Sequence, residues 1–287
     1  MNSRHSTTWM ILLGLLLLAG WIASACMAGN PQKTNLPFVL REPSTPTPTT
    51  SPPTWWHPAP GTTWQIQYTG ALDLSLDVQM YDLDLFETSQ SVMDQLHAAS
   101  QRVVCYFSAG SWEDWRPDAG QFPESVLGNE LEGWPGERWL DIRQIDVLGP
   151  IMAARLDLAA QKGCDGVDPD NVEGYGNDSG FTLTAQDQAS YNIWLAAQAH
   201  SRGLAVGLKN DLPQIPDLIN YFDWQLNEQC FQYNECDLLL PFIQAGKPVF
   251  NIEYQGDPAS ICPQANNMNF DTLVKHLDLD AWRLACR

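Results

Sequence analysis

Basic residues are scarce in this 287-residue chain: 15 Lys and Arg stand against 34 Asp and Glu, which gives a net charge of −19. Proteins that bind nucleic acid gather Lys and Arg against the phosphates, so this composition excludes nucleic acid as the partner. The acidity is compatible with a cationic ligand drawn to an acidic cleft, or with solubility alone. With 44% hydrophobic residues, the chain can form the core of one large domain or two small ones.

Several motifs of common enzyme classes are absent from the sequence. It has no C-x-x-C spacing for zinc, no Gly-x-Ser-x-Gly elbow and no G-x-G-x-x-G phosphate loop. Of its histidines, His5 and His57 precede the folded region, and we expect His97, His200 and His276 on helix surfaces. We therefore predict neither a metal site nor a cofactor.

The longest apolar run, residues 9–23, is shorter than the roughly 20 residues that a membrane span needs. It follows the basic Arg4 and leads into the small residues ASA and then Cys26. This pattern predicts a cleaved secretory signal at residues 1–25. It also resembles a bacterial lipobox, in which Cys26 would carry a lipid anchor to the membrane. We expect either a cell-surface lipoprotein or a secreted protein; an uncleaved anchor is the third alternative.

A Pro- and Thr-rich segment follows the signal. Residues 43–60 read PSTPTPTTSPPTWWHPAP, which forms neither helices nor sheets and is typical of an extended tether. We assign residues 26–61 to this disordered linker and residues 62–287 to one catalytic domain, expected to be monomeric.

Six cysteines remain beyond Cys26, and an even number in an exported chain indicates disulfides. The short separation favours Cys230 with Cys236, and Cys262 with Cys286 is the next pairing. Cys105 and Cys164 fall in strand-like runs, where each could equally be a buried small hydrophobic residue.

Short apolar runs alternate with helical patterns through the domain. The expected strands are residues 64–68, 78–82, 103–108, 166–170, 205–210, 224–228, 248–254 and 270–275, and the clearest helices are 91–101, 145–162 and 184–202. Thr184 and Asp187 have nearly the spacing and chemistry of a capping box. The order predicts an α/β fold, a (β/α)8 TIM barrel. A doubly wound sheet is the alternative, but its phosphate-loop glycines are missing.

Polar side chains follow most of these strands, and in a parallel barrel such positions meet at one face, where active sites are built. Asp170 ends the fourth expected strand and Glu228 the sixth, so their carboxyl groups face each other across the mouth. Two carboxyl groups flanking a bond are what glycoside hydrolysis requires. The remaining strand-end residues are predicted to bind substrate: Tyr68, Asp82, Asp168, Asn171, Lys209, Asn210, Glu253 and Tyr254.

The same residues are compatible with other interpretations. Asp168 and Asp170 could cap the next helix, and together with Asn171 and Asp178 they could offer oxygen ligands to calcium, although the EF-hand spacing is missing. Lys209 is most simply a partner that keeps a carboxylate ionised, because acids nearby would oppose the lowered pKa of a Schiff-base lysine.

Seven blocks carry a family resemblance, in this order: WQIQYTG from Trp64, CYFSAGSWEDWRPDAGQFP from Cys105, GERWLDIR from Gly136, GCDGVDPDNVEGY from Gly163, GLKND from Gly207, NEQCFQYNEC from Asn227 and GKPVFNIEY from Gly246. With them, the domain resembles glycoside hydrolase family 114, whose characterised activity is endo-α-1,4-polygalactosaminidase.

The resemblance implies a (β/α)8 barrel that cleaves a cationic amino-sugar polysaccharide, partly deacetylated poly-α-1,4-galactosamine, within the chain. It implies Asp170 as the nucleophile and Glu228 as the acid/base, with retention of configuration and Asp168 as the first substitute for Asp170. Loop residues Trp112, Trp115, Arg116, Glu137, Arg138 and Trp139 would form subsite walls or simply pack the loop. A tethered lectin-like barrel and a glycosidase for another α-glycan remain the alternatives.

Overall fold

The computed structural model describes residues 54–287. The predicted signal, the lipidation site at Cys26 and most of the predicted tether lie outside these residues. Within them, none of the helices has the length and apolarity needed to cross a membrane.

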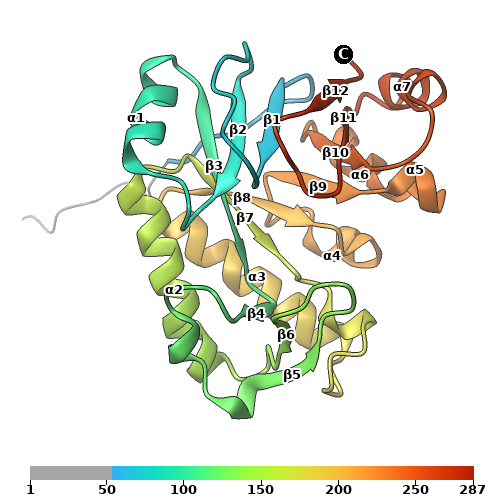
Figure 1. Ribbon diagram of the computed structural model, residues 1–287. Helices are drawn as coiled ribbons and strands as arrows, with labels where there is room; N and C mark the ends of the chain where they lie inside the picture. Colours follow the sequence, from blue (N-terminus) through green and yellow to red (C-terminus); the bar gives the residue numbers. More distant parts are fainter. Residues whose placement is uncertain (1–53) are drawn as a thin grey trace, which may run out of the picture. The chain divides into compact units, whose positions relative to one another are not determined.

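Eight parallel strands form the barrel, and every predicted strand is present with its ends shifted by no more than two residues. They are β1 (Trp64–Gln67), β2 (Met80–Asp84), β3 (Arg102–Ser108), β7 (Gly166–Asp170), β8 (Ala205–Lys209), β9 (Trp224–Glu228), β10 (Val249–Glu253) and β11 (Asp271–Lys275). Each pairs with the next in this order, which is the (β/α)8 arrangement predicted from the sequence (Figure 1).

The barrel is closed at its seam by the C-terminal segment. The short strand β12 (Arg283–Ala285) pairs antiparallel with β11, and the sequence analysis did not predict it. From the same segment, the carbonyl of Leu279 accepts a hydrogen bond from the backbone N–H of Tyr68 at 2.9 Å. The last residues of the chain thereby connect the first and last parallel strands.

The helices cover the outside of the strands (Figure 1). They are α1 (Gln90–Ala98), α2 (Ile145–Lys162), α3 (Ala185–Ser201), α4 (Ile215–Leu218), α5 (Cys230–Tyr233), α6 (Leu240–Gln244) and α7 (Pro258–Asn267). The capping box predicted for Thr184 and Asp187 is present at the start of α3. His276 does not lie on a helix surface as expected, because it follows β11 directly.

The barrel interior is filled by large apolar side chains, among them Trp224, which is fully buried. A Cβ atom at Gly207 would lie 2.2 Å from the indole nitrogen of Trp224, and one at Gly166 would lie 2.8 Å from the same ring. The two strands that lead to the mouth at Asp170 and Lys209 therefore need glycine where they pass this tryptophan.

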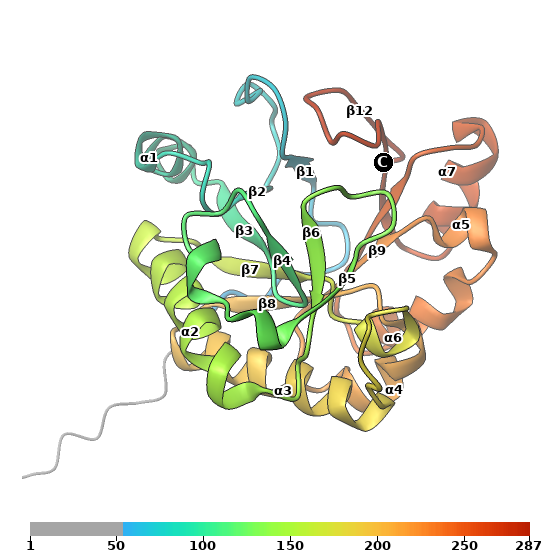
Figure 2. The same ribbon diagram turned by 60° about the horizontal axis from the view of Figure 1, so that its bottom comes forward.

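A small second sheet lies between β3 and α2 and was not predicted. It consists of β4 (Ser111–Glu113), β5 (Leu127–Glu130) and β6 (Glu137–Leu140), paired antiparallel in the order β4-β6-β5. Figure 2 shows this sheet in front of the barrel strands β7 and β8. It supplies one wall of the site described below.

Three disulfides join the six cysteines of the barrel domain. Cys230–Cys236 and Cys262–Cys286 confirm the predicted pairs. Cys105 and Cys164, considered as separate buried thiols, are instead bonded to each other. Strand β3 runs beside β7, which brings Cys105 against the residues just before β7.

The residues just before β1 also pack on the barrel. The indole N–H of Trp55 donates to Asp223 at 3.0 Å, and the ring stacks on His200 with 3.9 Å between the centroids. Trp56 lies against Trp224. The packed unit thus begins before residue 62, where the sequence analysis placed its boundary.

Candidate active site

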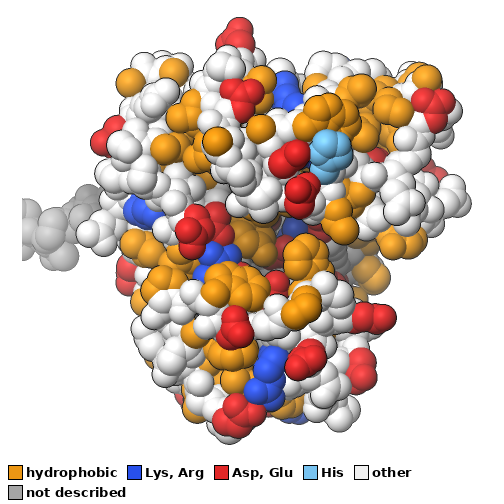
Figure 3. Space-filling model, viewed as in Figure 1, with side chains coloured by type: hydrophobic (Ala, Val, Ile, Leu, Met, Phe, Trp, Pro, Cys, Tyr) orange, Lys and Arg blue, Asp and Glu red, His pale blue; other side chains and the backbone are white. Residues whose placement is uncertain are grey.

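A pocket of about 460 Å³ opens at the carboxyl ends of the parallel strands. Its volume is in the range of small-molecule sites. Figure 3 shows a hollow across the middle of the face, with acidic and hydrophobic side chains around it. Both predicted catalytic residues line the pocket, as do five of the predicted substrate-binding residues: Tyr68, Asn171, Lys209, Asn210 and Tyr254.

The other three predicted substrate-binding residues lie elsewhere. Asp82 and Asp168 are fully buried and do not line the pocket. Glu253 is also fully buried and faces a different cleft, where it accepts a hydrogen bond from the backbone N–H of Phe231 at 3.0 Å. Side chains alternate along a strand, so the neighbour Tyr254 faces the mouth while Glu253 faces helix α5.

A shared backbone feature presents the strand-end side chains to the pocket. The residues that directly follow β7, β8 and β9 are Asn171, Asn210 and Gln229, with φ angles of 61°, 48° and 67°. Asparagine tolerates this left-handed conformation better than most residues. The chain turns sharply at each strand end, which leaves Asp170, Lys209 and Glu228 at the mouth.

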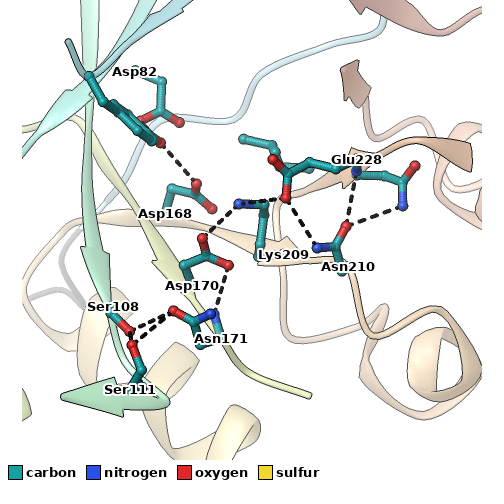
Figure 4. Close-up of polar contacts among 12 residues, drawn as sticks. Asp82, Ser108, Ser111, Asp168, Asp170, Asn171, Lys209, Asn210 and Glu228 are labelled. Atoms are coloured by element: carbon teal, nitrogen blue, oxygen red, sulfur yellow. Dashed lines mark hydrogen bonds and ion pairs between the residues drawn. The ribbon is translucent and has the colours of Figure 1, made fainter. Parts of the chain in front are cut away.

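Both oxygens of Asp170 are held. Oδ1 accepts from the backbone N–H of Asn171 at 2.7 Å, and Oδ2 lies 2.9 Å from the Lys209 ammonium (Figure 4). The Asn171 amide oxygen accepts hydrogen bonds from Ser108 at 2.7 Å and from Ser111 at 3.2 Å. This chain of contacts fixes the carboxyl group with one edge toward the pocket, where the side chain is 16% exposed.

Glu228 has looser contacts and greater exposure, 24% of its side chain. The Tyr254 hydroxyl donates to Oε1, while Oε2 lies 3.5 Å from the Asn210 amide and 3.4 Å from the Lys209 ammonium. The Asn210 amide oxygen also accepts from the backbone N–H of Glu228 at 3.0 Å. Lys209 thus lies between the two carboxyl groups.

Lys209 carries its charge in a site almost closed to water. Burial lowers the pKa of its ammonium, but attraction to Asp170, Glu228 and Asp168 outweighs burial and raises that pKa well above its ordinary value. A Schiff-base lysine needs the opposite shift, so the ion-pair role predicted for Lys209 agrees with the structure.

Beneath the pocket, Asp82 and Asp168 form a second layer. The Tyr68 hydroxyl lies 3.1 Å from Asp82 Oδ1 and 3.5 Å from Asp168 Oδ2. Burial raises the pKa of Asp168 to about 7, and burial together with the neighbouring Asp168 raises that of Asp82. At least part of this pair is protonated below neutral pH.

The second sheet and the loops beside it form one wall of the pocket. Some of these residues were predicted either to line the site or to pack the loop, and others were not predicted at all. Glu137 and Trp139 line the pocket, together with Trp134 and with Glu173 from the loop after β7. Arg116 instead packs the loop, with its guanidinium 2.7 Å from both Asp84 and Glu113. Strand-end logic cannot find Trp134 and Glu137, because they belong to an insertion rather than to a barrel strand.

Three buried carboxyl groups, those of Asp168, Glu137 and Asp211, predict that the stability of the fold decreases as pH rises. Burial raises the pKa of Asp168 and Glu137 to about 7 and of Asp211 to about 8. The folded state therefore binds protons that the unfolded state releases near pH 4, and this stabilisation is lost as pH rises toward 8. We expect Tm to fall by about 5 °C or more between pH 5 and pH 8.

Thermal unfolding followed by circular dichroism would measure this change. The variant Asp168→Asn, which cannot ionise, should show a smaller fall. A Tm that stays constant or increases between pH 5 and pH 8 would contradict the assignment of raised pKa values.

A (β/α)8 barrel with carboxyl groups on its fourth and sixth parallel strands, facing one pocket, has the site of a glycoside hydrolase. Residues 45–287 match glycoside hydrolase family GH114, and the chain belongs to this family. It is therefore a glycosidase. A search of curated proteins finds no match.

Two solved structures illustrate the likeness. Ega3 from Aspergillus fumigatus, solved with galactosamine, is 46% identical, with a TM-score of 0.75 over 81% of this chain and 98% of that one. The glycoside hydrolase domain of PelA from Pseudomonas aeruginosa is 12% identical, with a TM-score of 0.64 over 78% of this chain and 98% of the domain. The second comparison supports the fold alone.

Proposed function

We propose that this enzyme hydrolyses internal α-1,4 bonds of a cationic galactosamine polymer, with Asp170 and Glu228 as its catalytic residues. The observation that carries the proposal is the pair of carboxyl groups on either side of Lys209 in an acidic pocket. The 46% identical relative binds galactosamine, which supports an amino sugar as the unit recognised.

The geometry supports retention of configuration. The Lys209 Nζ atom lies 2.9 Å from Asp170 Oδ2 and 3.4 Å from Glu228 Oε2. Those two oxygens are therefore less than about 6.5 Å apart, which is compatible with the short separation of a retaining pair.

The roles follow from the surroundings of each carboxyl group. Lys209 and the N–H of Asn171 hold the carboxyl group of Asp170 in place, and its carboxylate attacks the anomeric carbon as the glycosidic bond breaks. Glu228, more exposed and less tightly paired, gives its proton to the departing oxygen. Glu228 then takes a proton from the water that hydrolyses the glycosyl ester on Asp170, so the α configuration is restored.

A substrate panel with product analysis tests the proposal. Partly deacetylated galactosaminogalactan should be cut to oligosaccharides of mixed length, whereas a neutral α-galactan should stay intact. Proton NMR recorded within the first minutes should show the α anomer as the first product. Cleavage of the neutral polymer at the same rate would contradict the substrate, and an initial β anomer would contradict the mechanism.

We also propose that the enzyme acts outside the cytoplasm as a monomer, exported by residues 1–25 and tethered by the part of the predicted linker that precedes Trp55, where packing on the barrel begins. The three disulfides support an oxidising compartment. Lipidation at Cys26 is the form of anchoring that we propose, and mass spectrometry of the mature N-terminus would test it.

A further inference from the structure

Buried polar side chains form a row on the outer face of the barrel sheet, beneath the helices. They are Asn227 on β9, Asn251 on β10 and Thr272 on β11, each at most 2% exposed. Side chains alternate along a strand, so these residues point away from the barrel interior, which their neighbours Leu226 and Leu273 help to fill. The parallel register pairs Asn251 with both Asn227 and Thr272. The face of a parallel sheet that packs against helices is ordinarily apolar, and amides buried there are costly unless they are hydrogen-bonded.

Hydrogen bonds join this row into a chain that leads to Glu228. The Thr272 hydroxyl donates to Asn251 Oδ1 at 3.1 Å, and the Asn251 amide donates to Asn227 Oδ1 at 3.2 Å. The Asn227 amide in turn donates to Asn210 Oδ1 at 3.3 Å. Asn210 then contacts Glu228 twice: its Oδ1 accepts from the backbone N–H at 3.0 Å, and its amide nitrogen lies 3.5 Å from Oε2 (Figure 4). The chain therefore connects β11 with the proposed acid/base.

One end of this chain fixes the orientation of the Asn210 amide. The backbone N–H of Glu228 can only donate, so the Asn210 atom that contacts it is the carbonyl oxygen. The amide nitrogen of Asn210 therefore faces the Glu228 carboxylate. The same carbonyl oxygen accepts from Asn227, so the amide nitrogen of Asn227 must lie on this side.

The other end of the chain fixes Asn251 independently. Glu253 Oε1 accepts from the backbone N–H of Phe231 at 3.0 Å, so the Asn251 atom 3.2 Å from this oxygen is the amide nitrogen. The same nitrogen donates to Asn227 Oδ1. Both ends thus require the same orientation of Asn227, and a flip of any amide would place like groups against each other and break the chain.

The chain acts on Glu228 through Asn210. The Asn210 side chain contacts both the backbone N–H and the carboxylate of Glu228. Hydrogen bonds linked in series strengthen and orient one another, so a fixed Asn227 also fixes Asn210. A general acid must lie within hydrogen-bond reach of the departing oxygen, and a small displacement of Glu228 would slow the transfer of its proton.

We propose that Asn227 and Asn251 are positioning residues for Glu228: acting through Asn210, they hold its carboxyl group where it can protonate the departing oxygen. This inference rests on the proposed function, which assigns the acid/base role to Glu228 but does not say what holds that residue in place.

The variant Asn227→Leu tests the inference, because it nearly keeps the size of the side chain and removes its hydrogen bonds. A displaced acid slows cleavage only where the leaving group needs a proton. We therefore expect kcat/KM on galactosamine polymer to fall about 10-fold or more. On a dinitrophenyl α-galactosaminide, whose phenolate leaves without protonation, kcat/KM should stay nearly unchanged. A purely structural role would lower both values together.

Asn251→Leu and Thr272→Val break the chain further from Glu228. Each should give the same pattern with a smaller loss, and Thr272→Val, which keeps the side-chain shape, carries the test if a leucine variant fails to fold. Equal losses on polymer and aryl substrate in the folded variants, or no loss in any of them, would overturn the assignment.

Gln188→Met is the matched control. Gln188 is a fully buried amide on α3 that donates to Asn192 at 2.9 Å. Its replacement should leave kcat/KM on both substrates unchanged, whatever its effect on Tm, which unfolding curves followed by circular dichroism would measure for every variant.

Glu228→Ala separates this inference from the proposed function. If Glu228 is the acid, this variant should lose activity on the polymer and keep most of its kcat/KM on the dinitrophenyl substrate. Equal losses on both substrates would refute the acid/base role itself. The expected pattern in Glu228→Ala, together with its absence in Asn227→Leu, would refute the positioning role alone.

Discussion

Asp170→Asn is expected to reduce kcat at least about 10³-fold on deacetylated galactosamine polymer, because the amide cannot form the glycosyl ester. Glu228→Gln should lose about 10²- to 10⁴-fold, the range for removal of a general acid. Each variant should lose some stability, because it removes a charged partner of the buried Lys209, but both should fold, since amide and carboxyl have the same shape. Initial rates of reducing-end release, with unfolding curves for each variant, measure both effects.

The two roles can be told apart with azide and an activated aryl α-galactosaminide. Asp170→Ala with azide should give the β-glycosyl azide, since azide then attacks in place of the missing carboxylate. Glu228→Ala should give the α-glycosyl azide, formed from the intermediate on Asp170. Exposed carboxyl groups outside the pocket provide the controls Asp146→Asn and Glu87→Gln, which should retain full activity. Near-normal turnover in Asp170→Asn would remove Asp170 from the mechanism.

Lys209→Met is expected to lower kcat/KM by about 10²-fold or more, because removal of one partner from a buried ion pair leaves the other charge uncompensated. Lys209 lowers the pKa of both Asp168 and Asp82, so its removal raises them further. Because both carboxyl groups lie directly beneath the catalytic pair, the acidic limb of the pH–rate profile should move to higher pH.

A structural role alone would not move that limb, so the pH profile is the decisive measurement. Lys247→Met is the matched control: Lys247 is also partly buried, but it donates to the backbone carbonyls of Ile219 and Phe222 away from the pocket. It should lower Tm and leave the pH–rate profile unchanged. A wild-type profile in Lys209→Met would show that Lys209 does not control the ionisation of the acids beneath the pocket.

The barrel strands could be predicted because each apolar run ends in a polar residue and is buried on both faces. The same logic located Asp170, Lys209 and Glu228 at one mouth. It failed for Glu253 because neighbouring side chains on a strand point to opposite sides. The sequence pattern locates the end of this strand only to within one residue, so it does not show which of Glu253 and Tyr254 faces the pocket. Asp82 and Asp168 are not the last residues of their strands, because β2 and β7 each continue for two more residues. Their carboxyl groups therefore lie beneath the pocket.

The acid-rich wall was harder to predict than the barrel. Glu137 lies on β6, which pairs with β4 and β5. All three strands are too short to show the alternation of apolar and polar residues that predicts a strand. Glu173 looks like an ordinary loop acid in the sequence, and only three-dimensional packing shows that one of its oxygens is buried without a partner. The Cys105–Cys164 pairing likewise depended on β3 and β7 being neighbours.

That disulfide has a consequence for how the enzyme can change over time. Cys105 and Cys164 are 59 residues apart, and the chain between them carries the second sheet and α2. The covalent link fixes both ends of this segment against the barrel. Because α2 and the end of β3 contribute to the barrel core, the part of the segment that is free to vary is confined to the second sheet and its loops, while Asp170 and Glu228 lie outside the segment.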